Sequence, residues 1–140
     1  MIGIVIVAHG GLAREYLAAV EHVVGPQQGI RAITIEDGHD RAEKQIEIRA
    51  AADAVDSGFG VVVVTDMFGA SPSNLSLKAC ENCEREIIYG ANLPLLIKLA
   101  KSRSLGVHAA VEAALDAGRK YINSYSAYGS REGMHGASGA

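Results

Sequence analysis

VVVVTDMFGASPSN, at residues 61–74, is the stretch that decides the fold. Its four consecutive valines are apolar and β-branched, which favours a strand buried on both faces in the middle of a parallel sheet. Asp66 then stands at the carboxyl end of that strand. Gly69 allows a tight turn, and Ser71 with Pro72 is typical of the first positions of a helix. The stretch therefore predicts a strand, an acid, and a helix whose amino end faces the space beside Asp66.

The rest of the chain alternates between apolar strands and helices. Residues 2–8, IGIVIVA, predict a second buried strand, which ends at His9 and is followed by two glycines. Apolar spacing and turn residues further predict helices at about 12–24, 41–56, 71–82, 94–102 and 107–117, and short strands at 32–35, 86–90 and 121–128. This alternation predicts an α/β fold, with a doubly wound, mainly parallel sheet and helices on both faces.

The composition predicts one domain and excludes several classes of function. The chain has 140 residues, 49% of them apolar, which suits one domain at residues 1–128, and the small, polar residues 129–140 predict a flexible tail. A net charge of -3 and few aromatic residues give no surface for nucleic acid. No apolar run approaches the roughly 20 residues that span a bilayer, and the start of the chain does not resemble a signal peptide. We therefore expect a cytoplasmic protein.

The two cysteines form a lone C-x-x-C, at Cys80 and Cys83. They fall near the end of the helix that is predicted from residue 71, where the helix dipole disfavours a thiolate. A zinc site needs two further ligands, and the sequence has no second cysteine pair. A structural role is therefore expected for both, and no metal site is predicted.

His9 and Asp66 end the two most apolar strands and are predicted to lie at the same edge of the sheet. An imidazole with one nitrogen held as N–H by a carboxylate presents the lone pair of its other nitrogen outward, as a nucleophile. The amides of Gly69, Ala70 and Ser71, with the Ser71 hydroxyl, are placed to hold a tetrahedral dianion. The pattern favours phosphoryl transfer, which depends on positioning and charge stabilisation. The residues alone also allow a structural interpretation, in which His9 donates to a carbonyl and Asp66 caps the turn.

Two other enzyme classes fit less well. GASPS begins like the serine elbow of hydrolases, but Ser73 stands where the elbow has its second glycine. An acid after a central strand is also found in phosphorylated receiver domains, but these need an acidic cluster after the first strand to bind magnesium. Residues 8–10 are Ala-His-Gly instead. Of the other histidines, only His39 is predicted at this edge, in a turn at the rim.

Three segments resemble one known family. IVIVAHG at residues 4–10, TDMFGASPSN at 65–74 and GANLPLL at 90–96 are similar, in the same order, to the mannose-family enzyme IIA domain of the bacterial phosphoenolpyruvate-dependent sugar phosphotransferase system. The similarity covers about residues 1–123. Phe68 stands where some members carry tryptophan, and Ala70 where a second glycine is common.

The resemblance implies a role for each of these positions. His9 would accept a phosphoryl group from the phosphocarrier protein HPr and pass it to an enzyme IIB partner. Asp66 would orient the imidazole, and Ser71 with its neighbouring amides, Gly69 and Ala70, would hold the phosphate. The predicted rim of the site comprises Phe68, Asn92 and Pro94. No cofactor is implied, and contact with a membrane permease is expected only through partners.

The resemblance also implies an assembly and leaves alternatives. Members of the family are commonly homodimers in which a C-terminal strand pairs across subunits, and 121–128 is the candidate segment. A fused enzyme IIB domain is not expected, and the chain is expected to serve a separate IIB or to report its phosphorylation state to a regulator. One alternative is the phosphotransfer subunit of a dihydroxyacetone kinase, whose turn after the third strand differs from FGASPSN. Another is a regulatory binding module that is controlled by phosphorylation of His9.

Overall fold

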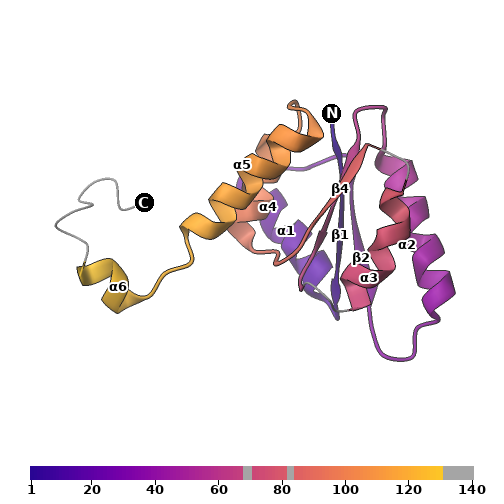
Figure 1. Ribbon diagram of the computed structural model, residues 1–140, viewed down its shortest axis with the longest axis horizontal. Helices are drawn as coiled ribbons and strands as arrows, with labels where there is room; N and C mark the ends of the chain where they lie inside the picture. Colours follow the sequence, from indigo (N-terminus) through magenta and orange to yellow (C-terminus); the bar gives the residue numbers. More distant parts are fainter. Residues whose placement is uncertain (68–70, 82–83, 131–140) are drawn as a thin grey trace.

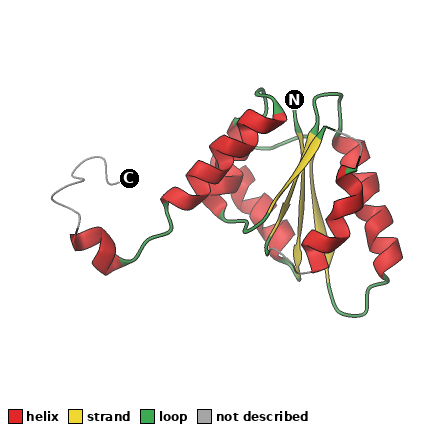
Figure 2. Cartoon of the chain, viewed as in Figure 1, coloured by secondary structure: helices red, strands yellow, loops and turns green. Residues whose placement is uncertain are grey.

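The computed structural model describes residues 1–67, 71–81 and 84–130, with the side chains of all of these except 71–73, 78 and 128–130 (Figures 1 and 2). The strands are β1 (Gly3–His9), β2 (Ile30–Ile35), β3 (Val61–Thr65) and β4 (Arg85–Ile88). The helices are α1 (Leu12–Val24), α2 (Arg41–Val55), α3 (Ser71–Ser76), the 3₁₀ helix η1 (Leu77–Cys80), α4 (Leu93–Lys101), α5 (Val107–Lys120) and α6 (Tyr125–Ser130).

The described strands form one parallel sheet in the order β2-β1-β3-β4. From β1 the chain passes through α1 to β2 on one side, and then through α2 back across to β3 on the other side. The strand order therefore reverses between β1 and β3, which is where open α/β sheets bind ligands. Val7 pairs with Thr65 in the register of these two strands. His9 and Asp66 consequently lie at the same edge of the sheet.

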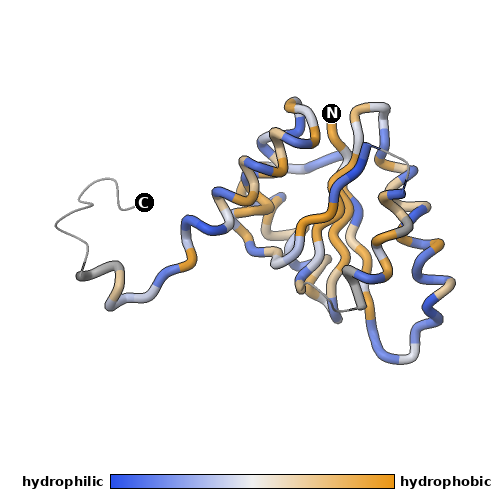
Figure 3. Tube along the Cα trace, in the orientation of Figure 1, coloured by the Kyte–Doolittle hydropathy of each residue, from blue (hydrophilic) through white to orange (hydrophobic). Residues whose placement is uncertain are grey.

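Alternate strand residues face opposite sides of the sheet, and helices cover both sides (Figure 1). On one side, α1, α4 and α5 cover the strands with buried residues that include Val20, Leu95, Leu99, Ala110 and Ala114. On the other side, the buried residues of α2 are Ile48, Ala52 and Val55. The strands in the middle are mostly orange in Figure 3, as expected for a sheet that is buried on both faces. The predicted α/β fold is confirmed.

Buried Arg103 fastens the amino ends of the strands, opposite the edge with His9. Its guanidinium group donates to three carbonyl oxygens, from Nε to Ile2 (2.8 Å) and from the two terminal nitrogens to Gln28 (2.6 Å) and Gly29 (3.2 Å). Burial lowers the pKa of Arg103, because the charged form loses water. This residue therefore ties the start of β1 to the turn before β2, and it serves the fold.

A second buried arginine joins α2 to β4. Arg85, whose side chain is 3% exposed, pairs with Asp53 (2.7 Å) and Asp56 (3.1 Å). The N–H of Gly58 donates to Asp56 (2.9 Å), and this bond, with the pairing to Arg85, lowers the pKa of Asp56 against the opposing effect of its burial. These charges hold one end of α2 on the sheet, away from the edge with His9.

Two predicted helices differ from the observed ones in length. The helix predicted at 71–82 is a short α-helix, α3, followed by η1. The helix predicted at 107–117 continues to Lys120, because Gly118 does not end it. Gly118 packs against α4 instead, and a Cβ there would lie 3.0 Å from the Cβ of Leu95. A missing side chain thus lets two helices approach closely.

The prediction of a strand at residues 121–128 is wrong for the single chain. The chain leaves α5 after Lys120 and forms the short helix α6 at Tyr125–Ser130, which stands away from the body of the molecule (Figure 1). A strand needs the edge of a sheet to supply its hydrogen bonds, and this segment does not reach one here. The predicted tail begins within α6, at residue 129, and residues 131–140 lie outside the described part of the chain.

Candidate active site at the carboxyl edge of the sheet

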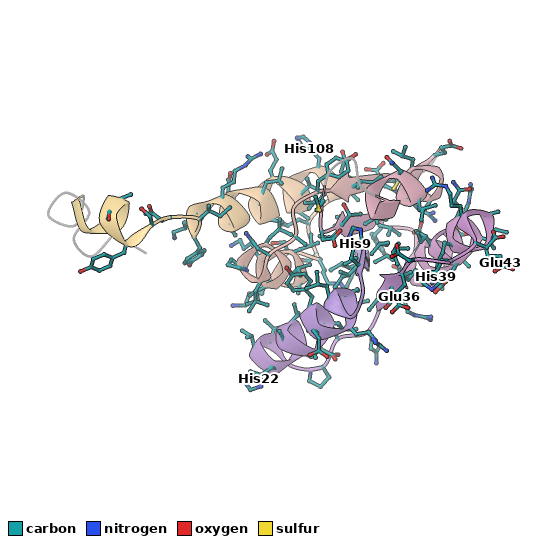
Figure 4. The ribbon with its side chains drawn as sticks, turned by 90° about the horizontal axis from the view of Figure 1, so that it is seen from below. His9, His22, Glu36, His39, Glu43 and His108 are labelled. Atoms are coloured by element: carbon teal, nitrogen blue, oxygen red, sulfur yellow. The ribbon has the colours of Figure 1, made fainter. Side chains whose placement is uncertain are left out.

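His9 is the last residue of β1, and a sharp turn presents its side chain at the edge of the sheet. Gly10 follows with φ +56°, a left-handed conformation that glycine adopts without strain. The N–H of Gly10 donates to the carbonyl oxygen of Ile35 on β2 (3.0 Å), which fixes the turn. The side chain of His9 is 48% exposed, and Figure 4 shows it well apart from His22 and His108. This imidazole is held in place and is still open to a partner.

One oxygen of Asp66 binds His9 twice. The Oδ2 atom lies 2.8 Å from Nδ1 of the imidazole and accepts the backbone N–H of His9 at 3.0 Å. A carboxylate can only accept, so it selects the tautomer of a neutral imidazole in which Nδ1 carries the proton. The lone pair of Nε2 is then free to attack. The interaction joins residues 57 positions apart in the chain.

The surroundings of the other Asp66 oxygen, Oδ1, make the negative charge of the carboxylate unfavourable unless His9 lies beside it. The Asp66 side chain is 11% exposed, and its Oδ1 atom is buried without a hydrogen-bond partner in the part of the chain that is described. A buried carboxylate gains most from a neighbour that carries positive charge. Asp66 is therefore suited to stabilise the charge that His9 acquires when Nε2 attacks.

The predicted phosphate-binding residues are described only in part. Phe68, Gly69 and Ala70 lie outside the described residues. Of Ser71 only the backbone is described, and α3 begins there. The predicted helix start after Asp66 is thus present, and the cradle for the phosphate stays a prediction.

The two remaining rim residues have other contacts. Asn92 caps α4 by accepting the N–H of Leu95 (3.0 Å), and its own amide donates to the carbonyl of Gly118 on α5 (2.9 Å). Pro94 lines a hollow of about 290 Å³ between α4 and the last turns of α5. In the described part of the chain, neither side chain is bonded to His9 or Asp66, so Asn92 is first a structural residue of this edge.

The turn after β2 borders the site on the other side. The Nδ1 atom of His39 accepts the N–H of Glu36 (3.0 Å), and the two side chains lie together beside the strand that ends in His9 (Figure 4). His39 thus occupies the predicted place in a turn at the rim. One of its ring nitrogens is used within the turn, which leaves the other for solvent or a partner.

Tyr16 is a residue near the site that the sequence patterns did not indicate. Its hydroxyl donates to the carbonyl oxygen of Ala91 (3.2 Å), in the loop between β4 and α4. Tyr16 precedes the buried Val20 by four residues on α1, so it belongs to the inward face of that helix. This spacing is the signal that could have found it, but the polar partner 75 residues away has no local signature.

Metal binding has no support in residues 1–67, 71–81 and 84–130, since no group of His, Cys, Asp and Glu in them could hold an ion. Cys80 belongs to η1 and Cys83 lies outside the described residues. Nor is any helix in these ranges long and apolar enough to cross a membrane.

A comparison with known protein families agrees with the fold and with the site at the edge of the sheet. The model of the family EIIA-man, described as the PTS system fructose IIA component, matches residues 3–117. The chain belongs to the EIIA-man family. The match includes His9, Asp66 and every strand of the sheet, so the predicted resemblance to mannose-family enzyme IIA is confirmed.

Relatives of this EIIA-man chain carry phosphotransferase names. It is 33% identical over 104 residues to the PTS system mannose-specific EIIAB component of Escherichia coli (strain K12), covering 73% of this chain and 32% of that protein. The chain thus spans about a third of the length of that relative. It is also 33% identical to YadI of the same strain, named as a phosphotransferase enzyme IIA component, over 74% of this chain and 71% of YadI.

Solved structures share the fold. The phosphotransferase system component EIIA from Streptococcus agalactiae superposes with a TM-score of 0.80 at 24% identity, over 90% of this chain and 98% of that one. The PTS IIA protein associated with the fucose utilization operon from Streptococcus pneumoniae has a TM-score of 0.75 at 28% identity, over 86% and 91%. The fold of these two phosphotransferase system IIA proteins therefore extends over nearly all of this chain.

Proposed function

We propose that this EIIA-man protein is a histidine phosphocarrier of the sugar phosphotransferase system. His9 accepts a phosphoryl group from phospho-HPr and passes it to an enzyme IIB partner in the cytoplasm. The observation that carries the proposal is the 2.8 Å contact between Nδ1 of His9 and Oδ2 of Asp66, which leaves Nε2 as the nucleophile. Membership of a phosphotransferase family supports the same reaction.

The transfer follows from the geometry of this pair. The Nε2 lone pair of His9 attacks the phosphorus of the donor's phosphohistidine, and a new N–P bond forms as the donor's N–P bond breaks. The electron pair of the broken bond returns to the donor imidazole. Asp66 holds the Nδ1 proton of His9 throughout and offsets the positive charge on the ring. Transfer to enzyme IIB is the same step in reverse, with His9 as the leaving group.

The phosphoryl oxygens need donors as charge shifts between the two imidazoles. We assign this role to the amides of Gly69, Ala70 and Ser71 and to the Ser71 hydroxyl, because these residues follow Asp66 within five positions and Ser71 begins α3. Preorganised N–H donors stabilise such charge without a metal. Phe68 and His39 then border the surface on which the partner protein sits.

The relay can be tested with the donor chain rebuilt in solution. The protein is incubated with phosphoenolpyruvate, enzyme I and HPr, and its intact mass is measured before and after brief acid and alkali treatment. We expect one phosphoryl group that requires HPr, is lost in acid and survives alkali, as a phosphohistidine does. Loss in alkali would point to an acyl phosphate on an aspartate, and the absence of any phosphoryl group would refute the proposed function.

A second step separates a carrier from a regulator. The purified phosphorylated protein is mixed with an enzyme IIB protein of the mannose family, and the loss of its phosphoryl group is followed over time. A carrier transfers the group to the enzyme IIB protein during this time course. A phosphorylated His9 that no IIB protein can discharge would instead favour the regulatory binding module.

We also propose that the protein is a homodimer held by its C-terminal segment. Three large side chains of this segment are exposed in the single chain, namely Tyr121 (58%), Ile122 (73%) and Tyr125 (94%). Burying them against a second copy would remove apolar surface from water. Sedimentation equilibrium should give twice the 14.6 kDa of the chain, and removal of residues 121–140 should give the monomer. A full-length monomer at micromolar concentration would contradict this assembly.

A further inference from the structure

A ring of bonds runs from His9 back to Asp66 through three other elements. From His9 the chain continues through Gly10 and Gly11 into α1, where Tyr16 lies in the second turn. The Tyr16 hydroxyl donates to the carbonyl of Ala91 (3.2 Å). The N–H of Ala91 donates to the carbonyl of Thr65 (3.0 Å). Asp66 is the next residue, and its carboxylate closes the ring on His9.

Two side chains close this ring, and every other link is backbone. One is Asp66, which binds His9 directly. The other is Tyr16, which connects the helix after His9 to the loop that braces the strand before Asp66. Resting on the phosphocarrier function above, we propose that Tyr16 is a positioning residue for phosphoryl transfer, since its hydroxyl keeps the carboxylate of Asp66 in register with the imidazole of His9.

The loop at Ala91 is rigid enough to transmit this constraint. Its neighbour Asn92 caps α4 through Leu95 and binds the carbonyl of Gly118 on α5. Thr65 is fully buried on β3, so it cannot move far without disturbing the core. Tyr16 is half-buried and packs against the core between the sheet and the helices α1, α4 and α5. The distance between α1 and the Ala91 loop is the part of this arrangement that can still vary. The Tyr16 hydroxyl sets that distance.

Tyr16→Phe removes the hydroxyl and keeps the ring, so it tests the bond rather than the packing. Without the bond, the Asp66 carboxylate samples positions that hold Nδ1 less well, and the population of the Nε2–H tautomer, which cannot attack, increases. One uncharged hydrogen bond corresponds to a change of about 2- to 10-fold in rate. We expect the transfer rate at saturating phospho-HPr to fall by this factor, with the KM for HPr unchanged.

Two variants serve as controls. Val23→Ala truncates a side chain of the same helix, α1, that is 53% exposed, and it should match the wild type. Ile48→Val shortens a fully buried side chain in the core between the sheet and α2. It lowers stability without touching the ring of bonds between His9 and Asp66. It should keep the wild-type rate at a temperature where the protein stays folded.

A purely structural role of Tyr16 would leave the tautomer of His9 unchanged. This tautomer is therefore the deciding measurement. The ¹⁵N shifts of its ring nitrogens, measured in the unphosphorylated protein, should report Nδ1–H in the wild type and both controls, and a mixture in Tyr16→Phe. Unchanged ¹⁵N shifts in Tyr16→Phe, an unchanged transfer rate, or an equal loss of rate in Ile48→Val would each overturn the proposal. If the wild type takes no phosphoryl group, the phosphocarrier function fails, and the ¹⁵N comparison alone still decides the role of Tyr16.

Discussion

His9→Ala should abolish phosphorylation by phospho-HPr while the protein stays folded. The substitution removes Nε2, the nucleophile that the proposed transfer requires. The fold should survive because His9 ends β1 with a side chain that is 48% exposed. Its backbone N–H, which donates to Asp66, is retained. Intact mass after incubation with the donor chain gives the phosphorylation, and circular dichroism with a thermal melt gives the fold.

The matched control is His22→Ala. His22 is exposed and lies in the last turn of α1, far from the edge that bears His9 (Figure 4). This variant should take one phosphoryl group at the wild-type rate. Phosphorylation of His9→Ala to the wild-type level would remove His9 from the mechanism, and the histidine that carries the group could then be found by peptide mapping.

Asp66→Asn should slow the transfer by about 10²- to 10⁴-fold without abolishing it. The amide can meet His9 in two orientations. With its oxygen toward Nδ1, it keeps the reactive tautomer but loses the negative charge that stabilises the ring. With its nitrogen toward Nδ1, it donates there and moves the imidazole proton to Nε2, which blocks attack. Both orientations cost rate, and the nucleophile itself remains.

Single-turnover transfer from phospho-HPr measures this effect. The rate at saturating donor should fall while the KM for HPr changes little, because Asp66 is largely buried and acts on the imidazole. Asp37→Asn is the matched control, since it removes one negative charge from the exposed turn after β2 at the same edge. The control should stay close to the wild type. An Asp66→Asn protein that transfers as fast as Asp37→Asn would show that the carboxylate has no part in the reaction.

The sequence was most informative where side chains act locally. Continuous apolar runs at 2–8 and 61–64 predicted the two central strands, because a strand covered on both faces needs apolar residues at every position. The start of α2, predicted at residue 41, is also set locally, because the Asp40 side chain caps the helix by accepting the N–H of Glu43. With the strand ends known, the parallel topology alone put His9 and Asp66 at one edge.

The C-terminal segment and the rim residues were harder to predict. Residues 121–128 contain tyrosines and an isoleucine, which favour a strand, but a strand exists only beside a sheet edge. Asn92 was expected at the rim, and its side chain is used to cap α4 and to hold α5. Both cases depend on which elements lie nearby, and local residue patterns carry no such information.

By itself, the sequence determined the fold class, the two buried strands and the candidate pair of His9 and Asp66, because apolar spacing and turn residues act over a few positions. Only the tertiary structure decided that a single oxygen of Asp66 binds His9 twice. It also decided that Tyr16 reaches Ala91. These contacts join residues 57 and 75 positions apart, and their distances follow from how helices and strands pack together, which depends on the whole core at once.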